Sequence, residues 1–333
     1  MNDLEELRGF RAEVPVRDSA AYAQARAALS GHMRAEAYGP RRWRLRLAVP
    51  VVAFAALAIV LAAAIGIGRA PDAANAASVL QNAAQKLQAV PAAPLTAGQY
   101  WYVEQTGRTL VGGAGDDPAG YLASMAMVHK LWIGPDGSGR IVRTDSDPVW
   151  VTPSDHDRWV AAGSPSLAGP TVDEQEPPGG LTFPFGSRTL TYAELRALPT
   201  DPAALGPMIA AAASATDTSS AAASQLELIG ELLRSTPLAP TQSAALYRVA
   251  ATLPGIELAG STTDPIGRPG VGVTITSNGY RQELVLDPDT GQLLGEIQTN
   301  LIDRPDMPAG TNVETVSYVR SGVVTSTTQI ASP

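Results

Sequence analysis

One stretch of the sequence carries no charge over 22 residues, and it constrains the chain more than any other feature. Residues 47–68 consist of apolar residues, Pro50 and two glycines. As a helix, the stretch would extend roughly 33 Å at about 1.5 Å per residue, enough to cross a hydrocarbon core of about 30 Å. A lone segment in lipid must be helical, because only a helix satisfies its own backbone hydrogen bonds there. We therefore predict a single transmembrane helix over residues 47–68.

The charges beside this stretch predict its orientation. Arginines crowd its N-terminal side, and only Arg69 follows it closely on the other side. The crowded arginines are Arg41, Arg42, Arg44 and Arg46. Because cytoplasmic flanks carry the positive excess, we expect a plasma-membrane protein with residues 1–46 in the cytoplasm and residues 69–333 outside.

Two alternatives to a membrane anchor remain open. Arg41-Arg42, the apolar run and then Ala74-Asn75-Ala76 resemble a cleaved twin-arginine signal. The segment before the apolar run is much longer than in ordinary signal sequences, which argues against cleavage. A buried core helix is the other alternative, but 22 uncharged residues exceed what a globular core requires.

Composition excludes several classes of function. The chain has 24 Lys and Arg against 32 Asp and Glu, and this net charge of −8 argues against nucleic-acid binding. The charge is unevenly divided, with +3 over residues 1–46 and −11 after residue 68. The basic edge can therefore still contact anionic lipid headgroups, and we expect the bilayer to be a partner. With no Cys and three His, we expect no disulfide, no Cys-ligated metal and no cofactor.

The arm of residues 1–46 is predicted to form two short amphipathic helices. Tyr22, Leu29 and Met33 recur at helical spacing in the second of them. Such helices cannot bury a core alone, so the arm either lies on the membrane without a partner or docks into a groove on a cytoplasmic protein.

The segment after the apolar stretch predicts a helix and linker over residues 69–98 and then one α+β region over residues 99–333. Aromatic and β-branched runs predict strands near both ends of that region, with helices between them. Asn278-Gly279 is typical of a two-residue hairpin turn. The predicted fold class is thus α+β, with one transmembrane helix, a cytoplasmic helical arm and an extracytoplasmic antiparallel sheet covered by helices.

Candidate catalytic groups are few. Asp155-His156-Asp157 places two carboxylates beside an imidazole, but Asp155 also suits a helix cap. The run from Asp287 to Gly291 begins like a calcium loop yet lacks the closing Glu, which favours a turn. No established catalytic motif is present, so we predict that the chain is not an enzyme.

Aromatic residues cluster in the first strand-rich part of the chain. These residues are either core anchors of the sheet or the lining of an apolar groove that holds a lipid or another hydrophobic ligand. The candidate groove residues are Tyr100, Tyr102, Trp132, Trp150 and Trp159.

Several motifs together resemble a family of uncharacterised actinobacterial single-pass membrane proteins that are typically encoded beside extracytoplasmic-function sigma factors. The motifs, which follow an Arg-rich edge and an apolar stretch, are Val79-Leu80-x2-Ala83-Ala84, Lys130-Leu131-Trp132-Ile133-Gly134-Pro135-Asp136-Gly137, Leu198-Pro199-Thr200-Asp201-Pro202, Leu253-Pro254-Gly255-Ile256-Glu257-Leu258, Asp264-x2-Gly267-Arg268-Pro269-Gly270 and Leu286-Asp287-Pro288-x-Thr290-Gly291-x2-Leu294-Gly295-Glu296. The resemblance implies an association with signalling and no site residues. In pattern alone, the region also resembles lipoprotein-carrier-like half-barrels.

Two functions follow as expectations. The first is an envelope signal sensor or anti-sigma-like regulator, whose arm restrains a cytoplasmic partner such as a sigma factor. The alternative is an anchored envelope protein that binds a lipid or a lipoprotein and has no signalling role.

Overall fold

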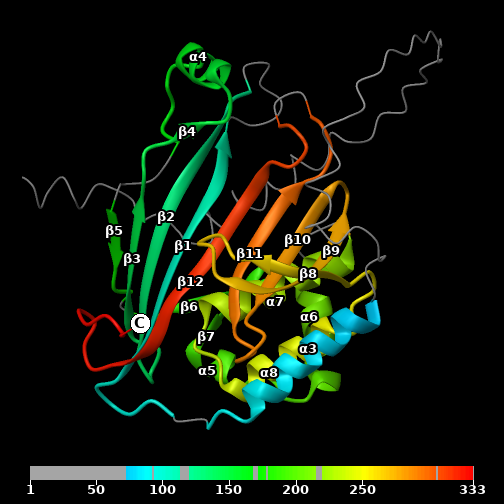
Figure 1. Ribbon diagram of the computed structural model, residues 1–333. Coiled ribbons are helices and arrows are strands. Elements are labelled where there is room, and N and C mark those ends of the chain that lie inside the picture. The colour runs from blue at the N-terminus through cyan, green and yellow to red at the C-terminus, as the bar shows by residue number, and fades with distance from the viewer. Residues whose placement is uncertain are drawn as a thin grey trace, which may run out of the picture.

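The computed structural model describes residues 73–91, 94–112, 120–167, 172–177, 179–214, 220–304 and 307–332. A large antiparallel sheet dominates this part of the chain, and a layer of helices covers one of its faces (Figure 1). The strands of this sheet are β1 (Tyr100–Gly112), β2 (Leu122–Ile133), β3 (Gly139–Asp145), β4 (Val149–Trp150), β5 (Val172–Gln175), β8 (Glu257–Thr263), β9 (Pro269–Ser277), β10 (Tyr280–Leu286), β11 (Leu293–Asn300) and β12 (Asn312–Val324).

Strand β12 joins the two halves of the sheet. The strand order is β5-β3-β2-β1-β12-β11-β10-β9-β8, with β4 paired to β2 outside this path. Strand β12 returns to pair with β1, so that Tyr100 lies opposite Val324. The described residues also contain a small hairpin of β6 (Thr182–Phe185) and β7 (Arg188–Thr191).

Turn chemistry sets the register of the C-terminal half. Asn278 and Gly279 have φ angles of 50° and 77°, as a two-residue hairpin between β9 and β10 requires. The hairpin predicted at these residues is confirmed. The segment from Asp287 to Gly291 is a turn in which the Asp287 carboxylate accepts hydrogen bonds from the backbone N–H groups of Asp289 and Thr290.

The helices pack against the sheet through their apolar faces. The larger helices are α3 (Ala73–Gln88), α6 (Pro202–Ser214), α7 (Ala221–Ser235) and α8 (Pro240–Ala250), and the shorter ones are α4 (Pro153–Ala161) and α5 (Tyr192–Arg196). Their buried side chains, such as Leu80, Leu226 and Tyr247, form one core with Val273 and Leu284 of the sheet. Helix α3, which lies within the helix and linker predicted over residues 69–98, therefore belongs to this core.

The predicted fold class is wrong in one respect. Among the described residues, no helix is long and apolar enough to cross a membrane. The longest, α3, has 16 residues, which corresponds to about 24 Å, and one of its faces is buried in the core. What the structure shows is a mixed α/β fold with a large antiparallel sheet. The predicted spanning segment, residues 47–68, lies outside the described residues.

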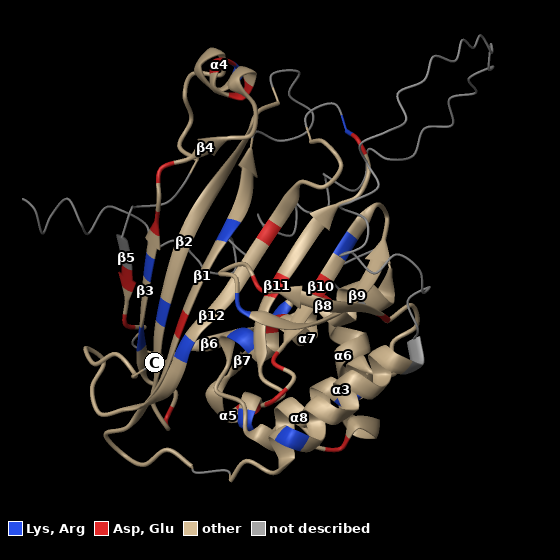
Figure 2. Ribbon diagram, in the orientation of Figure 1, with Lys and Arg blue, Asp and Glu red and all other residues tan. Residues whose placement is uncertain are grey.

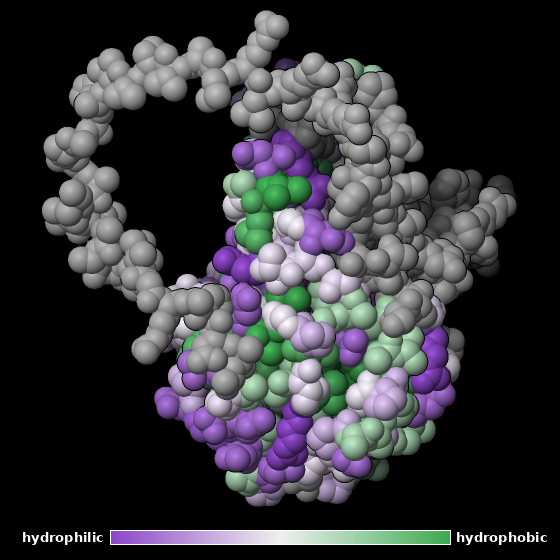
Figure 3. Space-filling view, turned by 90° about the vertical axis from the view of Figure 1, so that its right-hand side faces the viewer, coloured by the Kyte–Doolittle hydropathy of each residue, from purple (hydrophilic) through white to green (hydrophobic). Residues whose placement is uncertain are grey.

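Charge and hydropathy are distributed differently over the two layers. Charged residues are scattered along the strands, whereas much of the helix layer is uncharged (Figure 2). On the face turned toward the viewer in Figure 3, apolar residues gather in the middle of the described surface, with hydrophilic residues below them.

Candidate functional site

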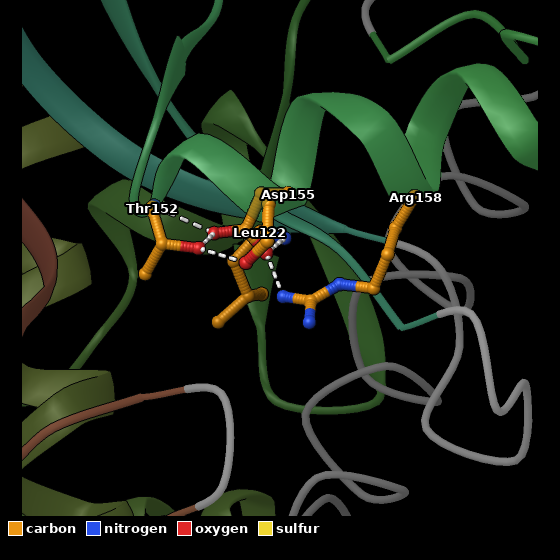
Figure 4. Close-up of polar contacts among 5 residues, drawn as sticks. Leu122, Thr152, Asp155 and Arg158 are labelled. Atoms are coloured by element: carbon orange, nitrogen blue, oxygen red, sulfur yellow. Dashed lines mark hydrogen bonds and ion pairs between the residues drawn. The ribbon is translucent and has the colours of Figure 1, made fainter.

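The structure assigns Asp155 of the predicted acid–base group to a helix cap (Figure 4). Its carboxylate is fully buried and accepts hydrogen bonds from the backbone N–H groups of Leu122 and Thr152, at 3.0 and 2.6 Å. The Thr152 hydroxyl and the Arg158 guanidinium donate two more, both at 2.6 Å. Burial alone would raise the pKa of Asp155, but these hydrogen bonds lower it below its usual value. Asp155 is thus a structural anchor for α4, and His156 beside it is exposed.

The five aromatic residues predicted to line one groove lie in two separate clusters. Tyr102 and Trp132 face each other on paired strands, with ring centroids 5.0 Å apart, and Tyr100 packs beside them. Trp150 pairs with Ala123, nine residues away from Trp132 along β2, which corresponds to roughly 30 Å. There the centroid of its ring lies 5.2 Å from the ring centroid of Trp159 and 5.4 Å from that of His156. The structure therefore does not bring the five together.

The remaining predicted site residues belong to residues 1–46, which lie outside the described part of the chain. Tyr22, Leu29 and Met33 of the arm lie outside the described residues, as do Arg41, Arg42, Arg44 and Arg46. Their docking and lipid-contact roles stay predictions.

A cluster of buried charges lies between α7 and the sheet. Arg234, in the last turn of α7, is 10% exposed, and its Nη1 atom is 3.8 Å from Glu296 Oε2 and 3.7 Å from Glu314 Oε1. Glu296 is on β11 and is 6% exposed, while Glu314 is on β12. We call Arg234, Glu296, Glu314, Tyr318 and Gln282 the Arg234 cluster.

Neutral groups complete the cluster. The Tyr318 hydroxyl donates to Glu296 Oε1 at 3.1 Å, and the Gln282 amide donates to Glu296 Oε2 at 3.4 Å. Gln105 of β1 donates to the backbone carbonyl of Arg234 at 2.7 Å and so ties the end of α7 to the middle of the sheet. The cluster therefore connects α7 to β10, β11 and β12, and Gln105 adds a link to β1.

Burial raises the pKa of Glu296 toward neutral pH. Desolvation raises its pKa to about 7, and the nearby Glu314 and Glu231 add to this effect. Arg234 and the Tyr318 hydroxyl act in the opposite direction. Burial also raises the pKa of Tyr318 well above its usual value, so this side chain stays a donor. Burial and the neighbouring carboxylates thus raise the pKa of Glu296 toward neutrality.

The space around the cluster is small and polar. A cavity of about 10 Å³ is lined by Glu227, Gln298 and four cluster members, Arg234, Gln282, Glu296 and Glu314, and a volume of this size admits about one water molecule. The carboxylate of Glu296 lies against the backbone of α7 at Gly230, where a Cβ atom would come within 2.6 Å of Oε2. An alanine here would require the Glu296 carboxylate or α7 to shift, which is a local reason for a glycine in the middle of α7.

The sequence did not predict this cluster, although one signal was present. Arg234 follows Leu226 by eight residues, which places it on the buried face of an otherwise apolar helical pattern. Glu296 and Gln298 alternate along β11 in a way that equally fits an exposed face, so their burial could not be predicted. No group of three or more His, Asp or Glu residues among those described is arranged to hold a metal ion.

Comparisons of the chain with family models, with curated proteins and with solved structures find no match.

Proposed function

We propose that the described domain is a sensing module in which the Arg234 cluster is the responsive element. The observation that carries this proposal is the pairing of Arg234 itself. Its guanidinium lies between the buried carboxylate of Glu296 and the carboxylate of Glu314, which is 22% exposed, yet the two distances, 3.8 and 3.7 Å, are longer than a charge-assisted hydrogen bond of about 2.7–2.9 Å.

Loosely paired buried charges stabilise a fold poorly. Desolvating ions costs several kcal/mol each, and this cost is offset only where the geometry is close and the remaining hydrogen bonds are satisfied. An apolar contact at the same position would hold α7 on the sheet at least as well. We therefore assign the charges of the Arg234 cluster a role in responding to a change in conditions rather than in stabilising the fold.

The direction of the response follows from the charges that face Glu296. The charged groups are Arg234 and Glu231 from α7 and Glu314 from β12, and the neutral Tyr318 hydroxyl also faces this carboxylate. Protonation of Glu296 removes one of the carboxylates that repel one another and leaves Arg234 to pair with Glu314 alone. Acidification should therefore tighten the contact between α7 and the sheet, and alkalinisation should loosen it.

The wider role rests on the sequence. An envelope sensor that reports to a cytoplasmic partner such as a sigma factor is supported by the family resemblance and by the amphipathic pattern of residues 1–46. The alternative, a lipid- or lipoprotein-binding protein, has less support, because it relied on five aromatic residues sharing one groove.

Hydrogen exchange of the full chain tests the proposal. Corrected for intrinsic exchange, the opening free energy of the α7 amides should be higher at pH 6 than at pH 8. In Glu296→Gln, which has the neutral form at every pH, that difference should vanish. Equal pH dependence in the two proteins would refute the sensing role of the cluster.

A further inference from the structure

A second cluster lies on the opposite face of the sheet from α7. Adjacent residues of a strand point to opposite faces, and Ile133 belongs to the core under the helices while Trp132 belongs to this cluster. Its buried members are Tyr102, Trp132, Val324 and Ala331.

The chain's own segment 325–332 covers this face. After β12 the chain turns back, and the Gln329 side chain accepts hydrogen bonds from the backbone N–H and the hydroxyl of Thr325, both at 3.0 Å. The following residues lie over Trp132, so the segment returns across the sheet that it has just left.

The contacts that hold the segment are nearly independent of its side chains. The Trp132 indole Nε1 donates to the backbone carbonyl of Gln329 at 2.6 Å. Arg140 Nη1 donates to the backbone carbonyl of Thr327 at 2.8 Å, and its guanidinium stacks over the Trp132 ring at 5.2 Å. Carbonyls two residues apart are thus recognised by two side chains of the sheet.

A single small side chain of the segment is buried. Ala331 packs among Tyr102, Trp132 and Val324, whereas Ile330 beside it is 47% exposed. The surface thus provides two donors for main-chain carbonyls and one apolar contact site for a small side chain. This combination is typical of sites that bind a peptide segment, in which main-chain hydrogen bonds give affinity and a pocket gives specificity.

We infer that the surface formed by Tyr102, Trp132, Arg140 and Val324 is a peptide-binding site that segment 325–332 occupies in this structure. The ligand class is a peptide with a small apolar residue two positions after a carbonyl bound by Trp132. A tethered segment has an effective concentration in the millimolar range, so only a tight or multivalent partner would displace it. This inference does not depend on the sensing role of the Arg234 cluster, because the two sites share no residue.

Binding of a labelled peptide with the sequence of residues 325–333 tests the inference. By fluorescence anisotropy, a chain ending at Val324 should bind it at least tenfold more tightly than the full chain does. An Ala331→Asp peptide should bind at least tenfold more weakly, because its carboxylate would be buried among apolar groups. An Ile330→Asp peptide is the matched control and should bind like the parent.

A second variant allows the same test if the chain ending at Val324 does not fold. The full chain with Ala331→Asp keeps every residue and should loosen only the segment, so it should bind the parent peptide more tightly than the unmodified chain. Failure of both folded variants to bind would overturn the inference. Equal binding of the Ala331→Asp peptide, or binding of phosphatidylglycerol vesicles in place of the peptide, would also overturn it.

Discussion

The Glu296 carboxylate lies against the backbone of α7 at Gly230, so closely that a Cβ atom at residue 230 would be 2.6 Å from Oε2 and 2.8 Å from Cδ. The contact brings a buried acid and a helix backbone together without any side chain between them. It therefore links the charge of one residue on β11 to the position of a whole helix.

Replacing this glycine tests the closeness of that contact. In Gly230→Ala the added methyl group must displace either Glu296 or α7, which costs about 1–3 kcal/mol and outweighs a helix-propensity gain of about 1 kcal/mol. Urea unfolding should therefore show a net loss of stability. Gly206→Ala in α6 is the control, since its Cβ would meet only Val249 Cγ2 at an ordinary 3.9 Å, and it should be neutral or stabilising. Equal stability of the two variants would contradict the packing described here.

The raised pKa of Glu296 predicts a pH dependence of stability. Between its unfolded value of about 4.5 and its folded value of about 7, the native state binds more protons than the unfolded state. The contribution of Glu296 to the free energy of unfolding is thus fully present below pH 4.5 and is lost as the pH rises through 7. The loss is on the order of 3 kcal/mol at most. Subtracting the stability curve of Glu296→Gln from that of the unmodified chain isolates this term. The free energy of unfolding of the unmodified chain, minus that of Glu296→Gln, should fall as pH rises. A difference that increases with pH would contradict the prediction.

Asp155 should behave in the opposite way. Its pKa is lowered, so its contribution is present above its unfolded pKa and disappears as pH falls through the lower folded value. Asp155→Asn replaces one of the two accepting carboxylate oxygens by an amide NH2 and removes the negative charge. It should lower the free energy of unfolding by about 2–3 kcal/mol. Urea unfolding or faster hydrogen exchange of the α4 amides would show this loss. Asp157→Asn is the control in the same helix; Asp157 is 86% exposed, and its loss should change stability by less than about 0.5 kcal/mol. If both substitutions have the same small effect, Asp155 is not the anchor of α4.

Much of the local structure was predictable from short-range rules. The Asn278-Gly279 turn follows from its residue types, and helices between two strand-rich ends of the region follow from the spacing of apolar residues. The order of the strands was not predictable, because β12 pairs with β1 across more than 200 residues and no local pattern specifies such a pairing.

The candidate site was predictable only in part. Trp132 and Tyr102 proved to be neighbours, but the sequence could not show that segment 325–332 would cover them. Arg234 and Glu296 are far apart in sequence and meet only because α7 lies over β11. Polar residues at inward positions look like ordinary surface residues until the packing partner is known.

The charge state of Glu296 is the most direct test of the account. In the full chain with ¹³C-labelled glutamate, the side-chain carboxyl resonance that disappears in Glu296→Gln can be followed against pH. We expect a midpoint near 7, because desolvation outweighs the attraction of Arg234. A midpoint at or below the ordinary value of about 4.5 would contradict this prediction, because Glu296 would then stay ionised throughout the range in which the cluster is proposed to respond.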